Sequence, residues 1–220
     1  MVAFGDIHGQ ENYIDRIKEL PQADWVIITG DLTNAGGKVA AERVIKKIRQ
    51  YNSNILAQIG NMDRLEIDQY FTKLGINLHG RGVKLDENLA IFGVGGSPPT
   101  PFNTPSEYEE EEIAAFLYTA YEEIKDVSHK ILITHSPPYG TTTDIVGRGE
   151  HVGSKVIREF IEKHQPDLCI CGHIHESRNK DQIGRTLILN PGSIDRGYAI
   201  IHWNGEELRA SLASYNKIRR

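Results

Sequence analysis

The sequence has no long apolar run, no leader-like start and few cysteines. No apolar stretch approaches the roughly 20 residues that a membrane-spanning helix needs, so we expect no membrane association. The start, "MVAFGDIHGQ", lacks the basic segment, apolar stretch and small-residue cleavage site of a signal peptide. We therefore expect a cytoplasmic protein.

An excess of positive charge is also missing. The net charge is −5, which argues against nucleic acid as a partner and against a nuclease, although a local basic groove stays open. The 220 residues are 39% hydrophobic and 25% charged, enough for one domain with a sizeable core. We expect a single domain over residues 1–220, and the sequence leaves its oligomeric state open.

The few cysteines sit close together. Cys169 and Cys171 lie in the run "DLCIC", where a disulfide across one residue would be badly strained. We interpret them as buried thiols that fill a strand. The alternative is a soft metal site that they form with the nearby histidines.

The first part of the chain alternates apolar runs with helical patterns, which is typical of parallel strands joined by helical crossovers. We expect the helix at 36–51 to turn Val39, Val44, Ile45 and Ile48 inward. Strands are expected at 2–4, 25–30 and 54–60, and helices at 11–20, 36–51 and 64–74.

The remainder mixes short strands, one irregular segment and further helices. The proline-rich segment 97–106 must be irregular, and we expect it, with an acidic helix at about 106–126, to form a wall over the site. The run "EYEEEEI" indicates a solvated helix start, with a partner-binding patch as the alternative. Short strands are expected at 76–80, 82–86, 89–96, 130–135, 167–173, 186–193 and 199–203, with a helix at 153–164. Two mixed sheets facing each other, with helices outside, accommodate this pattern.

Polar side chains that bind metals follow the expected strands at their carboxyl ends. Because the carboxyl ends of parallel strands gather at one edge of an open sheet, we expect these side chains to lie close together. In chain order they are Asp6 and His8, Asp31, Asn61, His135, and His173 and His175.

The chemistry of this set points to transition metals. Carboxylate, amide and imidazole ligands suit manganese, iron, zinc or cobalt, and so much nitrogen disfavours calcium and magnesium. The set exceeds what one tetrahedral ion takes, whereas two divalent ions sharing a carboxylate would use all of it. Paired ions of this kind, about 3.5–4 Å apart, act on phosphoryl groups.

The motifs "GDIHG", "GD", "GNMD", "THS" and "GHIH", in this order, resemble those of the calcineurin-like metallophosphoesterase superfamily, in particular its small prokaryotic phosphodiesterase-like branch. The resemblance spans residues 6–175, and "NPGS" at 190–193 extends it. It implies a four-layer α/β/β/α sandwich and hydrolysis of small phosphoesters, nucleotides included, by water that the ions activate. Phosphodiesters are the favoured substrates.

The resemblance also implies how the ligands are shared. Asp31 would bridge the ions, and Asp31 and Asn61 would act directly in catalysis. One ion would take Asp6, His8, Asp31 and His175. The other would take Asp31, Asn61, His135 and His173.

One departure from the family pattern concerns the proton donor. The family has a histidine after the asparagine that protonates the leaving group, and this sequence has Met62 there. General acid catalysis is typically worth about 10²–10⁴-fold, so we expect slower turnover or a preference for leaving groups that need little protonation. His79, His151 and Tyr139 are alternative donors. We expect Asp63 to hold the turn by accepting hydrogen bonds from backbone amides.

Substrate contacts are expected from the long segments around the site. Arg148 is the candidate phosphate contact, against the alternative of a solvated arginine. The main alternative to an enzyme is a catalytically weak metal-binding scaffold or a protein-interaction module on the same fold, with Met62 as its marker.

Overall fold

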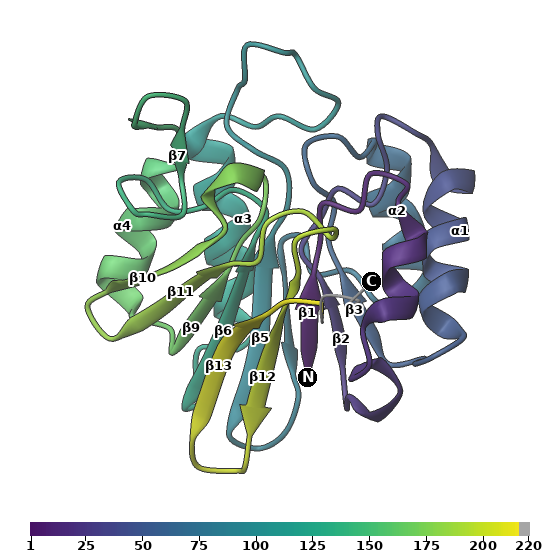
Figure 1. Cartoon of the computed structure of the whole chain (residues 1–220). Coiled ribbons are helices and arrows are strands. Elements are labelled where there is room, and N and C mark those ends of the chain that lie inside the picture. The colour runs from purple at the N-terminus through teal and green to yellow at the C-terminus, as the bar shows by residue number, and fades with distance from the viewer. Residues whose placement is uncertain (216–220) are drawn as a thin grey trace.

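The computed structural model describes residues 1–215, which form two β-sheets packed face to face with helices covering both outer sides (Figure 1). The four-layer sandwich expected from the sequence is confirmed. In Figure 1 the purple and blue N-terminal part and the yellow C-terminal strands supply one sheet and its helices, and the teal and green part supplies the other.

The first sheet combines parallel and antiparallel pairs. Its strand order is β13 (Leu208–Ala213), β12 (Tyr198–Trp203), β1 (Val2–Phe4), β2 (Val26–Ile28) and β3 (Ile55–Ala57). The pairs from β1 to β3 are parallel, whereas β12 pairs antiparallel with both β1 and β13. The chain thus returns to its first strand, and β13, which the sequence did not predict, adds an edge.

The second sheet is also mixed. Its strand order is β10 (Asn179–Ile183), β11 (Thr186–Asn190), β9 (Leu168–Ile170), β6 (His129–Thr134), β5 (Leu89–Val94) and β4 (Arg81–Lys84). The pairs between β11 and β5 are parallel, and both edge pairs are antiparallel. A separate hairpin joins β7 (Ile145–Val146) to β8 (Glu150–His151). The strand expected at 76–80 makes only isolated bridges.

Helices cover the outer faces of both sheets (Figure 1). They are α1 (Lys38–Arg49) and α2 (Leu65–Leu74) beside the first sheet, and α3 (Glu110–Glu122) and α4 (Lys155–His164) beside the second. None of the helices within residues 1–215 has the length and apolar character needed to cross a membrane.

The prediction of an α-helix at 11–20 is wrong. This segment forms short 3₁₀ turns, η1 (Glu11–Arg16) and η2 (Leu20–Gln22). The backbone becomes extended at Ile17, with ψ 96°, and Pro21 in the next turn has no backbone donor. Apolar spacing alone could not distinguish these turns from one α-helix.

The core lies on both faces of each sheet. In β2, Val26 and Ile28 pack under α1 and α2, whereas Ile27 between them points into the layer between the sheets. Because successive strand residues point to opposite faces, a strand buried on both sides reads as one continuous apolar run. That is the pattern seen in the sequence.

Val39 does not face the core as expected. Its side chain is 79% exposed, whereas Val44 is 1% exposed. The buried face of α1 consists of Ala41, Val44, Ile45 and Ile48, spaced three or four residues apart as one helix face requires. Val39 lies off this stripe, in the first turn.

The acidic run begins α3, as expected. Glu109 is the N-cap, and it forms a capping box with Glu112. The Glu109 side chain accepts a hydrogen bond from the Glu112 backbone N–H, and the Glu112 side chain accepts one from the Glu109 backbone N–H. Glu110 serves a second helix, since its carboxylate accepts hydrogen bonds from the Ser154 hydroxyl and the Lys155 amide at the start of α4. Part of the run therefore joins two helices on the outer face of the second sheet.

The two thiols are buried and free, which supports their interpretation as strand-filling side chains. Burial raises the pKa of Cys169 to about 12. The Cys171 thiol lies 3.5 Å from the Leu189 carbonyl oxygen, to which it donates. These are properties of inert structural thiols.

The two valines of α1 allow the core assignment to be tested with one chemical change. We expect Val44→Ala to lower the free energy of unfolding by about 2 kcal/mol, because it removes buried methyl groups and leaves a cavity. Val39→Ala is expected to change it by less than about 0.5 kcal/mol. Urea denaturation followed by circular dichroism measures both. Equal losses would contradict the placement of α1.

Candidate metal centre

All the metal ligands predicted from the sequence follow strands that end at one edge of the two sheets, and these strand ends form the upper edge in Figure 1. Each follows a strand directly or within a few residues. Asp6 and His8 follow β1, Asp31 follows β2, Asn61 follows β3, His135 follows β6, and His173 and His175 follow β9. Strands of both sheets thus contribute, and residues far apart in sequence meet at one place.

The backbone at this edge is strained. Asp6, His8, Asp31 and His173 have φ values of 48°, 47°, 53° and 66°, in the left-handed region that residues with a side chain rarely adopt. Each such residue costs about 1–3 kcal/mol and persists only where its surroundings hold it, commonly at functional sites. These turns directly follow the strand ends from which the candidate ligands come.

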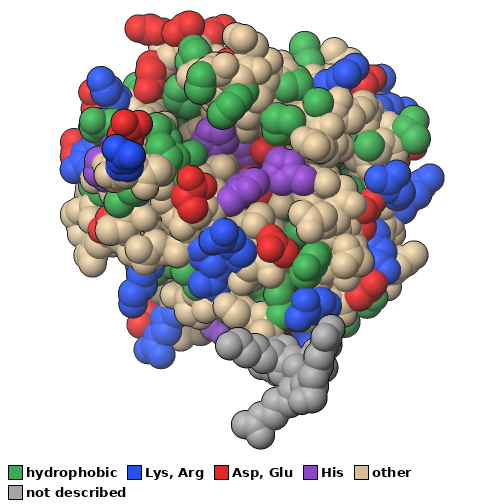
Figure 2. Space-filling view, turned by 45° about the horizontal axis from the view of Figure 1, so that its top comes forward, with side chains coloured by type: hydrophobic (Ala, Val, Ile, Leu, Met, Phe, Trp, Pro, Cys, Tyr) green, Lys and Arg blue, Asp and Glu red, His purple; other side chains and the backbone are tan. Residues whose placement is uncertain are grey.

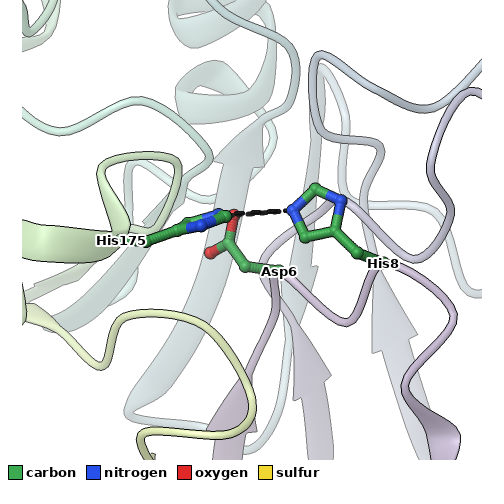
Figure 3. A group of neighbouring side chains, drawn as sticks. All are labelled: Asp6, His8 and His175. Carbon is green, nitrogen blue, oxygen red and sulfur yellow. Dashed lines mark hydrogen bonds and ion pairs between the residues drawn. The ribbon is translucent and has the colours of Figure 1, made fainter.

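Asp6, His8 and His175 form the first group of ligand atoms (Figure 3). The Nε2 atom of His175 lies 3.1 Å from Asp6 Oδ1 and 3.2 Å from His8 Nε2. The side-chain contact with Asp6, which outweighs partial burial, raises the pKa of His175. A carboxylate oxygen and two imidazole nitrogens therefore face one point.

Asp6, Asp31 and His135 form the second group, and within residues 1–215 these two groups are where histidine, cysteine and carboxylate atoms gather in this way. Asp31 Oδ2 lies 3.6 Å from His8 Nε2 and 3.4 Å from His135 Nε2. A single oxygen of Asp31 therefore faces histidines on both sides of the site.

His135 is oriented through both ring nitrogens. Nδ1 lies 3.1 Å from the Thr29 carbonyl oxygen, and Nε2 lies 2.9 Å from Asn61 Oδ1. Burial lowers the pKa of His135, but the Asp31 carboxylate outweighs burial and raises that pKa to about 9. Because a histidine that donates from Nδ1 to a carbonyl presents Nε2 to a metal, Nε2 can exchange its proton for a divalent ion.

His173 is the last of the predicted ligands, and it lies beside His135 and Asp6. Its ring centroid lies 5.2 Å from that of His135, and its backbone N–H lies 3.2 Å from both Asp6 carboxylate oxygens. Burial and the neighbouring His135 lower the pKa of His173 to about 4. The neutral imidazole is the form that binds metals.

Two glycines keep backbone out of the way of the carboxylates. A Cβ atom on Gly60 would lie 2.1 Å from Asp31 Oδ1, and one on Gly172 would lie 2.4 Å from Asp6 Oδ2. Neither separation is sterically possible. The glycines in "GNMD" and "GHIH" are therefore required by the close approach of backbone to ligand.

Asp63 holds the turn after β3, as the sequence predicted. Its carboxylate accepts backbone N–H groups of Leu32, Thr33 and Gly60 at 2.9–3.0 Å. Burial and the nearby Asp31 nevertheless raise the pKa of Asp63 to about 6. Asp63 thereby ties the turns that carry Asp31 and Asn61 to each other.

The ligands open into a cavity of about 690 Å³, which Figure 2 shows as a hollow where histidines gather among hydrophobic side chains. Its lining includes ligands of both groups together with Met62, Phe102 and Pro105. The half-buried Met62 lies where the family's proton donor would stand, and its backbone N–H donates to Asp31 Oδ1 at 2.8 Å.

The candidate proton donors lie elsewhere. His79 is half-buried and packs against Tyr108 and Phe116. His151 faces Asp144 Oδ1 at 2.6 Å, and its ring lies 5.8 Å from that of Tyr139. Among the described residues, none of these three candidates lines the cavity.

Arg148 lies in the exposed turn between β7 and β8 and does not line the cavity among the described residues. The hairpin is nevertheless attached to the site. It packs on the 3₁₀ turn η3 (His175–Ser177), where the Ser177 hydroxyl donates to the Ile145 carbonyl. The turn that carries His175 thus links Arg148 to the ligands.

Thr104 is a site residue that sequence reasoning missed. Its hydroxyl oxygen accepts a hydrogen bond from Asn61 Nδ2 at 2.9 Å, which turns the amide oxygen of Asn61 toward His135. The proline-rich segment was expected to form a wall. Thr104 is a polar residue followed by Pro105, and this was the available signal for a site residue in the segment. Nothing in the sequence, however, pairs Thr104 with Asn61.

The chemistry of these donors fits divalent transition ions. Carboxylate, amide and imidazole atoms lie within a few ångströms of one another on a strained, hydrogen-bonded edge, and this mixture of oxygen and nitrogen ligands is the one such ions prefer. A site of this composition can polarise a phosphoryl oxygen and bring a water molecule to it.

The chain is similar in sequence to one curated protein and in fold to several solved structures. An uncharacterized protein of Methanocaldococcus jannaschii, MJ1162, is 38% identical over 196 residues, which cover 87% of each chain. The crystal structure of TT1561 of Thermus thermophilus matches with a TM-score of 0.71 at 18% identity, covering 96% of this chain and 97% of that one. A dimetal phosphatase from Danio rerio matches with a TM-score of 0.68 at 8% identity, covering 97% and 95%.

The sequence profile of one family, described as calcineurin-like phosphoesterase, matches residues 1–177. This segment holds both groups of ligand atoms and the whole strained edge. Metal-dependent hydrolysis of phosphoric esters is the chemistry of that family and agrees with the donors described above. The chain therefore belongs to the calcineurin-like phosphoesterase family.

Proposed function

We propose that this protein, as one domain over residues 1–220, hydrolyses small phosphodiesters at a centre of two divalent ions of manganese, iron, zinc or cobalt. The position of Asp31 is the observation that carries the proposal. Its Oδ2 atom faces His8 at 3.6 Å and His135 at 3.4 Å, as a carboxylate shared by two ions must. The family match supports phosphoester hydrolysis, and the preference for diesters is part of the proposal.

The proposed ligands divide around Asp31. The proposal assigns Asp6, His8 and His175 to one ion, and Asn61, His135 and His173 to the other. The contacts among Asp6, His8 and His175 support the first set, and those of His135 with Asn61 and His173 support the second, although Asp6 also lies within reach of Asp31 and His135. When bound, the ions would supply Lewis-acid polarisation of the phosphoryl oxygens and would lower the pKa of a water molecule that attacks phosphorus.

The chain itself contributes orientation. Met62 N–H fixes one oxygen of Asp31, so the other faces the site. Thr104 holds the amide nitrogen of Asn61, so its carbonyl oxygen is presented as a ligand. Rotation of the Asp31 carboxylate or the Asn61 amide would break one of these hydrogen bonds. A site that is already oriented needs no such reorganisation during the reaction.

Within residues 1–215, the side chains that line the cavity beside the proposed ligands include no evident proton donor for the leaving group. Met62 lines the cavity and cannot donate a proton. Asp63, which could orient a histidine at that position, already accepts three backbone N–H groups. We therefore propose that the enzyme favours leaving groups that depart as stable anions. A catalytically weak scaffold on the same fold is the alternative, and activity assays decide between them.

The role of Asp31 is tested by removing its charge. We expect the manganese-loaded protein to hydrolyse bis(p-nitrophenyl) phosphate faster than p-nitrophenyl phosphate, and Asp31→Asn to reduce kcat/KM by about 10³-fold or more while lowering bound metal. Absorbance of nitrophenolate and elemental analysis measure the two effects. Asp126→Asn, an exposed carboxylate on the outside of the second sheet, is the control. A metal-loaded wild type that is inert on a broad phosphoester panel would favour the scaffold.

A second prediction concerns position 62. In a series of aryl methyl phosphates, we expect the wild-type rate to fall steeply as the pKa of the leaving phenol rises. Met62→His is expected to raise the rate for the poorest leaving groups by about 10-fold or more, because an imidazole can donate a proton. Met62→Leu serves as the control. An unchanged dependence on leaving-group pKa in Met62→His would contradict the interpretation.

A third prediction concerns Arg148, which we propose as a phosphate contact supported by the attachment of its hairpin to the His175 turn. Arg148→Ala is expected to raise KM for bis(p-nitrophenyl) phosphate by about 10-fold, since an arginine–phosphate bond is charge-assisted. Steady-state kinetics measure it. Arg209→Ala, an exposed arginine on β13, should leave KM unchanged. Equal KM values in both variants would identify Arg148 as solvated.

A further inference from the structure

We propose that Phe102 and its loop form a subsite that binds a planar aromatic group of the ligand beside the metal centre. The inference rests on the proposed function, because it places the phosphate of the same molecule at the metal ligands. It adds a substrate class, namely phosphoesters in which an aromatic ring lies close to phosphorus.

The exposure of Phe102 is the first observation. Its side chain is 81% exposed, although burying a phenyl ring is strongly favourable. The ring is not on a remote surface. It lines the same open cavity as His8, Asp31, His173 and His175, so a molecule bound at these side chains shares the cavity with this ring.

The loop that carries Phe102 is internally fixed. Glu107 accepts hydrogen bonds from the hydroxyls of Thr100 and Thr104, each at 2.6 Å, and from the Thr104 backbone N–H at 2.7 Å. The Phe102 N–H lies 3.2 Å from the Thr100 hydroxyl oxygen, and Asn103 turns the chain with a φ of 49°. One network of hydrogen bonds therefore sets the position of the Phe102 backbone.

The same loop is bonded to the turn that supplies a metal ligand. Asn61 Nδ2 donates to the Thr104 hydroxyl oxygen at 2.9 Å, and the Ser106 N–H donates to the Asn61 carbonyl at 3.0 Å. The Ser106 hydroxyl donates to the Asp63 carbonyl at 2.6 Å. Phe102 consequently stands at a defined place relative to Asn61, as a specificity-determining residue must.

The chemistry of the surrounding wall selects an uncharged ring. Met62, Pro105 and Ala35 are the apolar neighbours of Phe102 in the cavity lining, and Asn34 and Asn103 add uncharged amides. An apolar wall disfavours a charged group, and an aromatic side chain stacks on any flat ring. A nucleobase and a simple aryl group both meet these conditions.

Binding of matched ligand pairs to the manganese-loaded protein tests the subsite. Isothermal titration calorimetry compares AMP with ribose 5-phosphate, and phenylphosphonate with propylphosphonate. In each pair the phosphoryl group is retained and only the ring differs. We expect the ring to tighten binding by about 10-fold, which corresponds to about 1.4 kcal/mol. A gain in the first pair alone identifies a nucleobase subsite, and a gain in the second pair alone identifies an aryl subsite.

Three variants assign the gain to Phe102. We expect Phe102→Ala to abolish the difference within each pair and Phe102→Trp to preserve it. Val39→Ala, at a side chain that is 79% exposed on α1, should leave it unchanged. Equal affinities within both pairs in the wild type, or a difference that survives in Phe102→Ala, would overturn the proposal. Because the readout is binding, a protein that hydrolyses no ester but keeps the preference would refute only the proposed activity.

Discussion

The electrostatic relation between the Asp31 carboxylate and its imidazole neighbours is the interaction on which the site depends. Burial opposes ionisation of Asp31, which is only 2% exposed, but His135 and His8 outweigh burial and lower its pKa to about 2. An unpaired buried charge of this kind would be strongly destabilising. The divalent ions that the family implies would supply at this place the positive charge that a protonated imidazole supplies here, so metal binding and the stability of the site would draw on the same attraction.

The two-sheet framework makes this concentration of charge possible. The ligands come from the ends of β1, β2, β3, β6 and β9, and these ends are fixed by an apolar core on both faces of each sheet. The left-handed turns at Asp6, His8, Asp31 and His173 are unfavourable locally. They are held because backbone bonds such as those to Asp63 join neighbouring turns.

Much of this arrangement could be predicted from the sequence, because apolar runs, glycines and the residues that follow them are local signals. The features that the sequence did not predict correctly depend on tertiary context. Val39 fits an apolar pattern but lies off the buried stripe of α1. The edge strands β10 and β13 alternate polar and apolar residues too weakly to be recognised. The bond between Thr104 and Asn61 joins segments whose pairing only the fold reveals.

The bond from Asn61 to Thr104 has a consequence for how this protein can diverge. Loops over an active site are usually the part that evolution exchanges most freely. Here the loop over the cavity also fixes the amide of Asn61, a proposed ligand, so replacing the whole loop would disturb the proposed metal site along with the selectivity. Under the proposed function, new specificities are therefore accessible mainly at the tip, around Phe102 and Asn103, while Thr104 and Glu107 stay constant. A redesign of ligand selectivity would accordingly vary the tip of the loop and keep Thr104 and Glu107.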